Sequence, residues 1–312
     1  MSNILITGGT GSLGQALVKK LLTPKKDVVK YKDVPLIWDS QCNKVIVYSR
    51  SEHKQEEMCN ALSETHDVSN LRFFLGDIRD RARLDTALRG NAVSSIINAA
   101  ALKVVPKGEY DPIEFVKTNI YGVQNIIEAA AEHGVYKVMQ VSTDKAVAPI
   151  NLYGATKLTA EKMILAANNM YGYSGPVYGF VRYGNVVGSS GSVVPLFRKQ
   201  YANRQPFTIT DPRMTRFWIT LDEASDFVLD SLELLGLDDT RRVSIPDMPA
   251  TNIVDVARAI GGKKYPINIT GTRPGEKIHE IIALEGEGGA LKNSEDAPRM
   301  SVAKIRKALK RI

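Results

Sequence analysis

The sequence predicts an α/β fold, a Rossmann-type doubly wound parallel sheet with a smaller C-terminal α/β substrate-binding lobe. Short β-branched runs alternate with amphipathic stretches from Ile4 to Arg182, which is typical of a parallel sheet covered by helices on both faces. A glycine-rich turn follows the first run, where dinucleotide-binding folds carry it. The 312 residues are 44% hydrophobic and 24% charged, so the chain can bury a large core.

The strands and helices follow from apolar periodicity, which is two residues in strands and about 3.6 in helices. The expected strands are Ile4–Thr7, Lys44–Ser49, Arg72–Leu75, Ser95–Ala99, Lys137–Ser142 and Pro176–Arg182. The expected helices are Gly14–Leu22, Glu52–Ser63, Arg81–Leu88, Phe115–His133 and Tyr153–Asn168. The lysine- and proline-bearing segment Thr23–Asn43 interrupts this alternation as an insertion. We expect its lysines to lie in a solvated loop, the alternative being a binding patch.

The pattern changes after Arg182. Glycine and serine alternate near Gly184, Gly188 and Gly191, and a helix is expected over Leu221–Leu237, because Thr220 and Glu223 form a capping-box pattern. Arg241–Ile245 predicts one last strand, and Ser301–Ile312 predicts a short basic amphipathic helix. We therefore expect a Rossmann domain over 1–185, to which 221–245 returns, and a smaller substrate-binding lobe over 186–220 and 246–312; the motifs described below assign the first domain to NADP.

Composition narrows the classes of protein. No apolar run approaches the ~18 residues of a membrane span, and the start at Met1 leaves no room for a signal peptide before Ile4. Cys42 and Cys59 are too few for a disulfide framework and suit a reducing compartment, so we expect a cytoplasmic protein. The net charge of +7 is compatible with nucleic acid, an anionic surface or phosphorylated small molecules.

The glycine-rich turn indicates a phosphate site. Thr7–Gly14 (TGGTGSLG) satisfies both GxGxxG and GxxGxxG between the first strand and the first helix. Glycines there allow a tight turn and close approach of the backbone to a pyrophosphate, which then faces a helix N-terminus. The alternative is a purely structural glycine turn. The residues expected to contact the cofactor are Gly8, Thr10, Gly11, Ser12, Leu13 and Gly14.

The second strand of the alternation favours NADP over NAD. It ends in Ser49 and Arg50, with Lys54 on the next turn, where NAD sites usually carry an acidic residue for the ribose 2′-hydroxyl. A hydroxyl and two cations suit a 2′-phosphate, although the two cations could instead only solvate the loop. Asp77 and Ile78 follow the third strand and are expected to face the adenine; alternatively, Asp77 caps a helix that begins near Arg79.

The catalytic residues are predicted from two neighbouring motifs. Tyr153 and Lys157 form YxxxK at a helix start, so both lie on one helical face. We expect the ammonium to lower the pKa of the phenol, so that Tyr153 exchanges a proton with substrate. Thr143, Asp144 and Lys145 end a strand at the ligand edge of the sheet, where Thr143 can bind the reacting oxygen. The alternative for the acid–base pair is a surface ion pair without a chemical role.

YxxxK behind a glycine-rich turn resembles the short-chain dehydrogenase/reductase superfamily. Longer motifs resemble the inverting UDP-N-acetylglucosamine 4,6-dehydratases from the first strand to about Glu280. These motifs are Val141–Val147 (VSTDKAV), Pro149–Lys157 (PINLYGATK), Ala99–Lys103 (AAALK), Lys117–Ile120 (KTNI), Arg182–Val186 (RYGNV), Asp211–Thr220 (DPRMTRFWIT) and Arg273–Lys277 (RPGEK). The related dehydratases of UDP-glucose and dTDP-glucose carry Asp-Glu where this chain has Asp144-Lys145.

The resemblance implies a catalytic cycle that regenerates NADP. Tyr153 accepts the O4 proton as NADP⁺ takes hydride from C4, and Lys145 then removes the C5 proton. Asp144 protonates the C6 oxygen, water leaves, hydride returns to C6, and C5 is reprotonated from the opposite face. Lys145 must be neutral for part of this cycle, and we expect burial or neighbouring Lys157 to lower its pKa. No metal is implied.

The resemblance also implies ligand contacts. Ala99, Ala100 and Lys103 would contact the cofactor, with Lys103 also near substrate. Asn185, Arg216, Arg273 and Glu276 would hold UDP-N-acetylglucosamine, and arginine suits its phosphates; the alternative for Arg216 is a structural pair with Asp211 or Asp222. Asn98 and Val104 stand where the family commonly has histidine. Family members suggest a homo-oligomer such as a hexamer. From the composition and the motifs we expect no membrane or nucleic-acid partner.

Three other functions remain open on the sequence. The first is another enzyme that uses Tyr153, Lys157 and Thr143: a UDP-sugar 4-epimerase, a reductase or a non-inverting UDP-hexose 4,6-dehydratase. An epimerase or a reductase would not need the Asp144-Lys145 pair. An NADP-sensing or nucleic-acid-binding protein would fit the basic charge, but no aromatic-basic recognition module is found. A degenerate enzyme retained as a subunit is the third.

Overall fold

The computed structural model describes residues 2–23, 26–31, 34–39, 43–189, 192–237, 242–285, 287 and 291–310. Cys42, Gly191, Arg241 and the last two residues, which entered the predictions above, lie outside these ranges, as do positions 24, 25, 32, 33, 40 and 41 of the predicted insertion.

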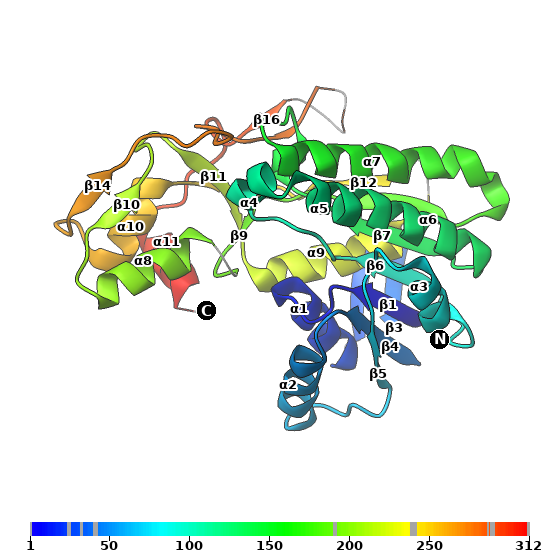
Figure 1. Cartoon of the computed structure of the whole chain (residues 1–312). Coiled ribbons are helices and arrows are strands. Elements are labelled where there is room, and N and C mark those ends of the chain that lie inside the picture. Colours follow the sequence, from blue (N-terminus) through cyan, green and yellow to red (C-terminus); the bar gives the residue numbers. More distant parts are fainter. Residues whose placement is uncertain are drawn as a thin grey trace.

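A seven-stranded sheet forms the centre of the molecule (Figure 1). Its order is β12-β8-β7-β6-β1-β4-β5, and every neighbouring pair is parallel. The strands are β1 (Asn3–Thr7), β4 (Lys44–Ser49), β5 (Leu71–Leu75), β6 (Ser95–Asn98), β7 (Lys137–Val141), β8 (Val177–Val181) and β12 (Val243–Ser244). The order reverses direction between β1 and β6, so their carboxyl ends diverge into a crevice that suits a ligand.

Helices cover both faces of the sheet, which confirms the doubly wound prediction. On β4, Val45 and Val47 join the core under α1 (Ser12–Leu22), α2 (Glu52–Ser63) and α9 (Leu221–Leu234). Ile46 and Tyr48 alternate into the core under α3 (Arg81–Leu88), α6 (Gly122–Glu132) and α7 (Leu152–Tyr171). All four side chains are fully buried, as expected of a strand with helices on both sides.

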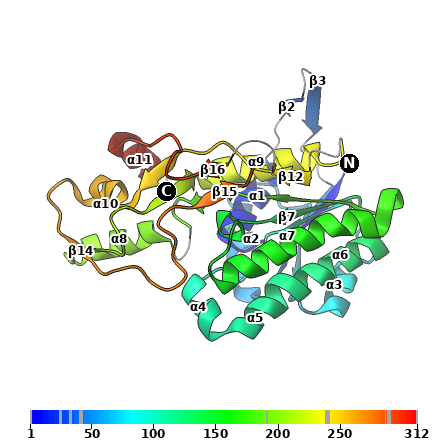
Figure 2. The same ribbon diagram turned by 90° about the horizontal axis from the view of Figure 1, so that it is seen from above.

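A third hydrophobic cluster lies among the C-terminal elements, around Phe197, Phe207, Trp218, Val256 and Ile305. The elements of this part are the strands β9 (Asn185–Val186), β10 (Phe207–Ile209), β11 (Thr215–Ile219), β13 (Ala250–Asn252), β14 (Ile267–Ile269), β15 (Ile281–Ala283) and β16 (Lys292–Asn293), with the helices α8 (Val193–Ala202), α10 (Ile253–Gly261) and α11 (Val302–Leu309). Apart from β9, β15 and β16, which lie nearer the central sheet, they form the flank opposite α3 and α6 (Figures 1 and 2). The predicted domain boundaries remain a prediction.

The expected helix over Phe115–His133 has a different beginning. The chain forms α4 (Val105–Tyr110), α5 (Pro112–Val116) and a π-helical segment, η1 (Lys117–Tyr121), before α6. Asn119 lies buried in η1, and its side chain exchanges two hydrogen bonds of 2.9 Å with the backbone of Leu102. The wider π turn therefore directs a polar side chain inward to hold the loop after β6, consistent with the frequent occurrence of π-bulges at functional sites.

Two further expectations need correction. Within Thr23–Asn43, the backbone forms an antiparallel hairpin of β2 (Lys26–Tyr31) and β3 (Val34–Asp39), which projects from the body in Figure 2, so the segment is not simply a loop. Helix α9 begins at the confirmed capping box of Thr220 and Glu223 but ends at Leu234. It stops there because Leu235 is extended and Gly236 has a φ of +86°.

The part of the chain that the structure describes contains no helix long and apolar enough to cross a membrane.

Candidate active site

A cavity of about 1040 Å³ opens at the carboxyl ends of the sheet strands. Its walls come from the glycine-rich turn, the ends of β4 to β7, the first turns of α7 and the C-terminal segment around Arg273–Glu280. Every residue predicted as a site residue lines it except Asp144, which lies fully buried directly beside Lys145. The structure therefore brings residues from distant parts of the sequence into one site.

The glycine-rich turn packs so closely against neighbouring backbone that two of its glycines have no space for a side chain. A Cβ on Gly8, which has a φ of +66°, would lie 2.8 Å from the backbone nitrogen of Ala100. A Cβ on Gly14 would lie 2.4 Å from the Cα of Gly9. Helix α1 starts directly behind the turn, and no side chain caps its first turn. Its free N–H groups and the bare backbone fit the pyrophosphate of a dinucleotide.

Where the cavity wall follows the end of β4, it carries two cationic side chains, and no acidic side chain stands at the end of the strand. Arg50 lies 3.7 Å from Asp77, and Lys54 lines the same wall. Burial would raise the pKa of Asp77, but hydrogen bonds from Arg79 and the charges of Arg79 and Arg50 outweigh it and lower that pKa. Asp80, not Asp77, caps α3; the alternative that Asp77 caps this helix is therefore wrong.

The turn after β7 places an acid, a base and a hydroxyl in contact. It forms a short 3₁₀ helix, η2 (Asp144–Ala146), and Thr143 Oγ1 accepts from the Lys145 backbone N–H at its start. Thr143 Oγ1 lies 3.0 Å from Asp144 Oδ1, and Lys145 Nζ donates to the same oxygen at 2.9 Å. Asp144 is 0% exposed, so the alternative of a surface ion pair is wrong.

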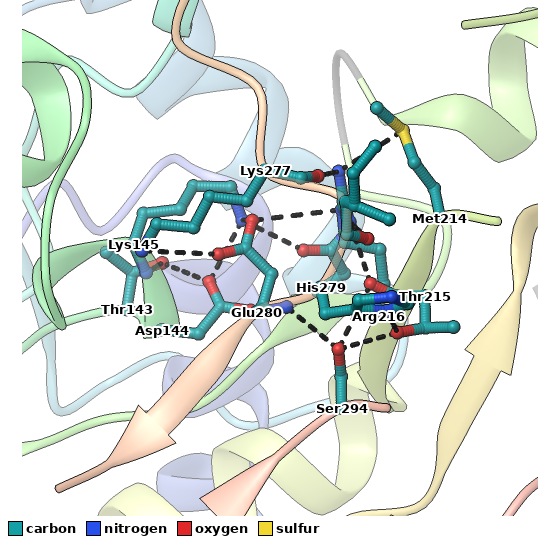
Figure 3. A network of polar contacts seen from close by, with 12 residues as sticks. Thr143, Asp144, Lys145, Met214, Thr215, Arg216, Lys277, His279, Glu280 and Ser294 are labelled. Carbon is teal, nitrogen blue, oxygen red and sulfur yellow. Dashed lines mark hydrogen bonds and ion pairs between the residues drawn. The ribbon is translucent and has the colours of Figure 1, made fainter. Parts of the chain in front are cut away.

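A carboxylate that the sequence reasoning missed, Glu280, joins this turn (Figure 3). Its side chain is 3% exposed, and its Oε1 lies 3.6 Å from Lys145 Nζ and 3.8 Å from Arg216 Nε. Lys277 Nζ lies 3.9 Å from the other carboxylate oxygen. Glu280 follows the RPGEK segment by three residues. That short distance in sequence from Lys277 gives no indication that Glu280 contacts Lys145.

The pKa of Lys145 moves opposite to the expectation. Burial lowers this pKa, but the charges of Asp144 and Glu280 outweigh the burial and raise it above the ordinary lysine value. Asn185 Oδ1 accepts a further hydrogen bond from the Lys145 ammonium at 3.2 Å. The free protein therefore holds Lys145 as a protonated group. Burial acts in the predicted direction, but the expected net lowering of this pKa is wrong, and Lys157 is not among the groups that act on it.

Tyr153 and Lys157 lie on α7, which begins behind Asn151, whose side chain accepts from the Gly154 N–H. Burial raises the pKa of Tyr153 to about 12, although the Lys145 charge and a hydrogen bond with Thr143 oppose this. Burial also lowers the pKa of Lys157 to about 8, and its ammonium donates to the Val141 carbonyl at 2.6 Å. The expected lowering of the phenol pKa by Lys157 is therefore wrong for this structure.

The residues predicted to bind substrate line the C-terminal wall of the cavity, and they differ in how far their side chains are already engaged in hydrogen bonds. Arg216 donates to the backbone carbonyls of Thr215, Lys277 and Ile278; Asp211 pairs with Arg213 and Asp222 with Lys20, so the proposed structural pairs of Arg216 are wrong.

Arg273 lines the cavity, and its guanidinium has no hydrogen-bond or ion-pair partner among the described residues. Glu276 accepts from the Arg273 backbone N–H at 3.2 Å. Among the same residues, no group of histidine, cysteine and carboxylate side chains could hold a metal ion.

The two positions that depart from the resemblance differ in setting. Asn98 is fully buried inside the sheet, where it accepts from Thr7 at 2.5 Å and donates to Gln140 at 2.6 Å. Val104 lines the cavity and is 48% exposed. Of the two, only Val104 can touch a ligand directly.

Comparison with known proteins places the chain in a family. Residues 4–303 match the model of a family described as "Polysaccharide biosynthesis protein". This chain belongs to that family. Among its relatives, the inverting UDP-N-acetylglucosamine 4,6-dehydratase of Campylobacter jejuni subsp. jejuni serotype O:2 is 46% identical over 281 residues, which are 90% of this chain and 77% of that protein. The resemblance found in the motifs is thereby confirmed.

Other members of the family are named for a different reaction. The UDP-glucose 4-epimerase of Rickettsia bellii is 38% identical over 287 residues, covering 91% of this chain and 78% of the epimerase. Among solved structures, Pen from Bacillus thuringiensis superposes with a TM-score of 0.85 at 30% identity and covers 100% of this chain, with 98% of Pen matched. The dTDP-glucose 4,6-dehydratase DesIV of Streptomyces venezuelae, solved with NAD, shares the fold at a TM-score of 0.75 and 21% identity, with 99% of this chain and 96% of DesIV covered.

Proposed function

We propose that this chain is a hydro-lyase that converts UDP-N-acetylglucosamine to UDP-2-acetamido-2,6-dideoxy-β-L-arabino-hex-4-ulose, with bound NADP and inversion at C5. The observation that carries the proposal is the buried Asp144–Lys145 contact of 2.9 Å in the same site as Tyr153. Oxidation of an alcohol needs only the tyrosine and its neighbours, whereas elimination of water needs a base and an acid as well. The 46% identical relatives that bear this name support the substrate.

A bound nicotinamide dinucleotide supplies the hydride acceptor for C4 and the hydride donor for C6. The residues of the chain handle protons and orientation. Tyr153 exchanges a proton with O4, and Thr143 lies beside it to orient that oxygen. Lys145 takes the C5 proton, and Asp144 delivers a proton to the C6 hydroxyl so that it leaves as water. After hydride has returned to C6, C5 takes up a solvent-derived proton from the face opposite Lys145, which inverts its configuration. Lys157 lies one helical turn after Tyr153 on α7, and its ammonium is anchored on the Val141 carbonyl.

The electrostatics require a proton to move within the site before elimination. In the free protein, Lys145 is held as an ammonium by Asp144 and Glu280. Transfer of its proton to Asp144, across the 2.9 Å hydrogen bond, leaves Lys145 as a neutral amine and Asp144 as an acid. These are the forms that removal of the C5 proton and protonation of the C6 hydroxyl require, so one transfer prepares both groups.

The cofactor is proposed to be NADP because of the cavity wall next to β4. Gly8, Thr10, Gly11, Ser12, Leu13 and Gly14 would hold the pyrophosphate, with Ser49, Arg50 and Lys54 at the 2′-phosphate, Asp77 and Ile78 at the adenine, and Ala99, Ala100 and Lys103 along the next strand end. Arg50 and Lys54 both line this wall, and cations there favour a phosphate over a hydroxyl.

The UDP-sugar is proposed to bind along the opposite wall. Arg273 has its guanidinium available for the diphosphate, while Arg216 is oriented by three backbone carbonyls. Asn185 already contacts Lys145 at 3.2 Å, so it would lie beside the reacting carbons. Lys103 and Glu276 complete the wall. We also propose a homo-oligomer, which light scattering of the purified chain tests directly.

The function is tested by incubating the purified chain with UDP-N-acetylglucosamine and NADP and following the product by mass spectrometry. Loss of one water is expected. Lys145→Ala should abolish dehydration, whereas Lys304→Ala, a change of an exposed lysine on α11, should dehydrate at the wild-type rate. Unchanged substrate mass with the wild-type chain, or wild-type dehydration by Lys145→Ala, would refute the proposal.

A 4-epimerase is the second candidate, because relatives at 38–39% identity carry that name. An epimerase would need Tyr153, Lys157 and Thr143 but would retain the C6 hydroxyl. A product of unchanged mass with inverted configuration at C4 would establish this function in place of dehydration.

A further inference from the structure

Glu280 is a buried carboxylate that takes part in no step of the proposed reaction. Its side chain is 3% exposed, and its Oε1 lies 3.6 Å from Lys145 Nζ. The loop that carries it leads into β15, which belongs to a different part of the chain from the η2 turn. Burying a carboxylate away from water costs free energy unless neighbouring cations compensate its charge. The burial of Glu280 therefore calls for a functional or structural explanation.

The position of Glu280 is fixed by its backbone. Its N–H donates to Ser294 Oγ at 2.8 Å, and its carbonyl accepts from the Ser294 N–H at 2.8 Å. Ser294 Oγ lies 2.7 Å from Thr215 Oγ1, and Thr215 precedes Arg216. These bonds (Figure 3) fix the backbone of Glu280, from which its buried side chain reaches the Lys145 amino group.

The groups that face the pair come from four parts of the fold. Lys145 is faced by Asp144 on its own turn, Glu280 before β15, Arg216 on β11 and Tyr153 on α7. Glu280 is faced by Lys145, Asp144, Arg216 and Lys277. Burial raises the pKa of the Glu280 carboxyl, and the three cations, each within 4 Å, oppose this rise and favour its charged form. One oxygen of each carboxylate, Asp144 Oδ2 and Glu280 Oε2, has no hydrogen-bond partner among the described residues. The carboxylates therefore act on Lys145 through one oxygen each.

We infer that Glu280 is a positioning residue for the Asp144–Lys145 pair: its carboxylate holds the Lys145 amino group against Asp144 and sets the pH at which that group loses its proton. The inference rests on the proposed function, in which Lys145 is the base at C5. Burial alone lowers the pKa of Lys145, and Asp144 and Glu280 together reverse this. Removing the Glu280 charge should therefore let Lys145 lose its proton at lower pH.

The test measures exchange of the C5 hydrogen of UDP-N-acetylglucosamine with deuterated water as a function of pH. Glu280→Gln keeps the shape and removes the charge, so the acid limb of the profile should move to lower pH by about one to three units. Glu280→Asp keeps the charge but moves it one methylene farther from the Lys145 amino group. The acid limb of this variant should therefore lie between those of the wild type and Glu280→Gln. Glu295→Gln removes a 57% exposed carboxylate that lies 3.5 Å from His279 in the same segment, and should leave the limb at the wild-type pH.

A purely structural role would reduce the rate without moving the limb, and a limb at the wild-type pH in both Glu280 variants would overturn the inference. The second readout needs no substrate. The Lys145 signal in the NMR spectrum of lysine-labelled protein, assigned by its loss in Lys145→Ala, should titrate at lower pH in Glu280→Gln.

An unchanged titration midpoint overturns the inference even if the enzyme turns over. A shifted midpoint without any conversion of UDP-N-acetylglucosamine by the wild-type chain supports the control of Lys145 by Glu280 and refutes the proposed function alone.

Discussion

Arg182 should be the most costly single side chain to remove outside the cavity. It is 1% exposed and forms two bonds to Glu161, at 3.0 and 2.6 Å, one to the Ile282 carbonyl at 2.9 Å and one to Glu287 at 2.7 Å. Arg182→Met leaves Glu161, also 1% exposed, as a buried anion whose remaining hydrogen bond among the described residues comes from the Ser142 hydroxyl. Breaking a buried pair in this way costs about 3–5 kcal/mol of unfolding free energy.

The loss would be measured by urea unfolding of wild type and Arg182→Met. The matched control is the double variant Arg182→Met/Glu161→Leu, which removes both charges and should recover most of the loss, because an apolar pair can replace a buried ion pair at little cost. A loss below about 1 kcal/mol in the single variant, or a double variant as unstable as the single one, would refute the reasoning. Arg182 also fixes Ile282, two residues after Glu280, so the single variant should turn over more slowly.

Three further predictions follow from the cavity. Arg50→Ala should weaken NADP binding about 10- to 100-fold, because a charge-assisted hydrogen bond is lost, and leave NAD binding nearly unchanged in calorimetric titrations; equal losses would contradict the 2′-phosphate assignment. Gly14→Ala should abolish cofactor binding and lower the melting temperature, because its Cβ would lie 2.4 Å from Gly9 Cα; wild-type binding would argue against the cradle. Burial lowers the pKa of Lys157 to about 8, so the folded chain binds fewer protons there than the unfolded chain. The stability of wild type relative to Lys157→Met should thus rise by about 3 kcal/mol between pH 8 and 10.5, and a flat difference in urea unfolding would contradict it.

Much of the fold could be predicted from the sequence because local patterns determine it. The alternation of Val45, Ile46, Val47 and Tyr48 fixes a strand buried on both faces, and Thr220 with Glu223 fixes the start of α9. The hairpin within Thr23–Asn43 could not be predicted in this way. Its prolines and lysines favour a loop locally, and the pairing of β2 with β3 depends on contacts that periodicity does not report.

The candidate site was predictable where its residues lie close together in the sequence. Tyr153 and Lys157 share a helical face through their spacing, and Asp144 and Lys145 are adjacent. The charge state of Lys145 was not predictable, since it depends on Glu280, which reaches the η2 turn only through tertiary packing. The same limit explains why the phenol pKa of Tyr153 was misjudged: spacing placed Lys157 nearby, but burial determines the result.

The stereochemistry at C5 tests the central claim most directly. The purified chain, supplied with NADP, would be incubated with UDP-N-acetylglucosamine in deuterated water, and the product would be analysed by mass spectrometry and NMR. If Lys145 removes the C5 proton and Asp144 assists loss of water, the product lacks one water, carries one deuterium at C5 and has inverted configuration there. A dehydrated product that keeps its C5 hydrogen or its C5 configuration, or a product that keeps the C6 hydroxyl, would contradict the account.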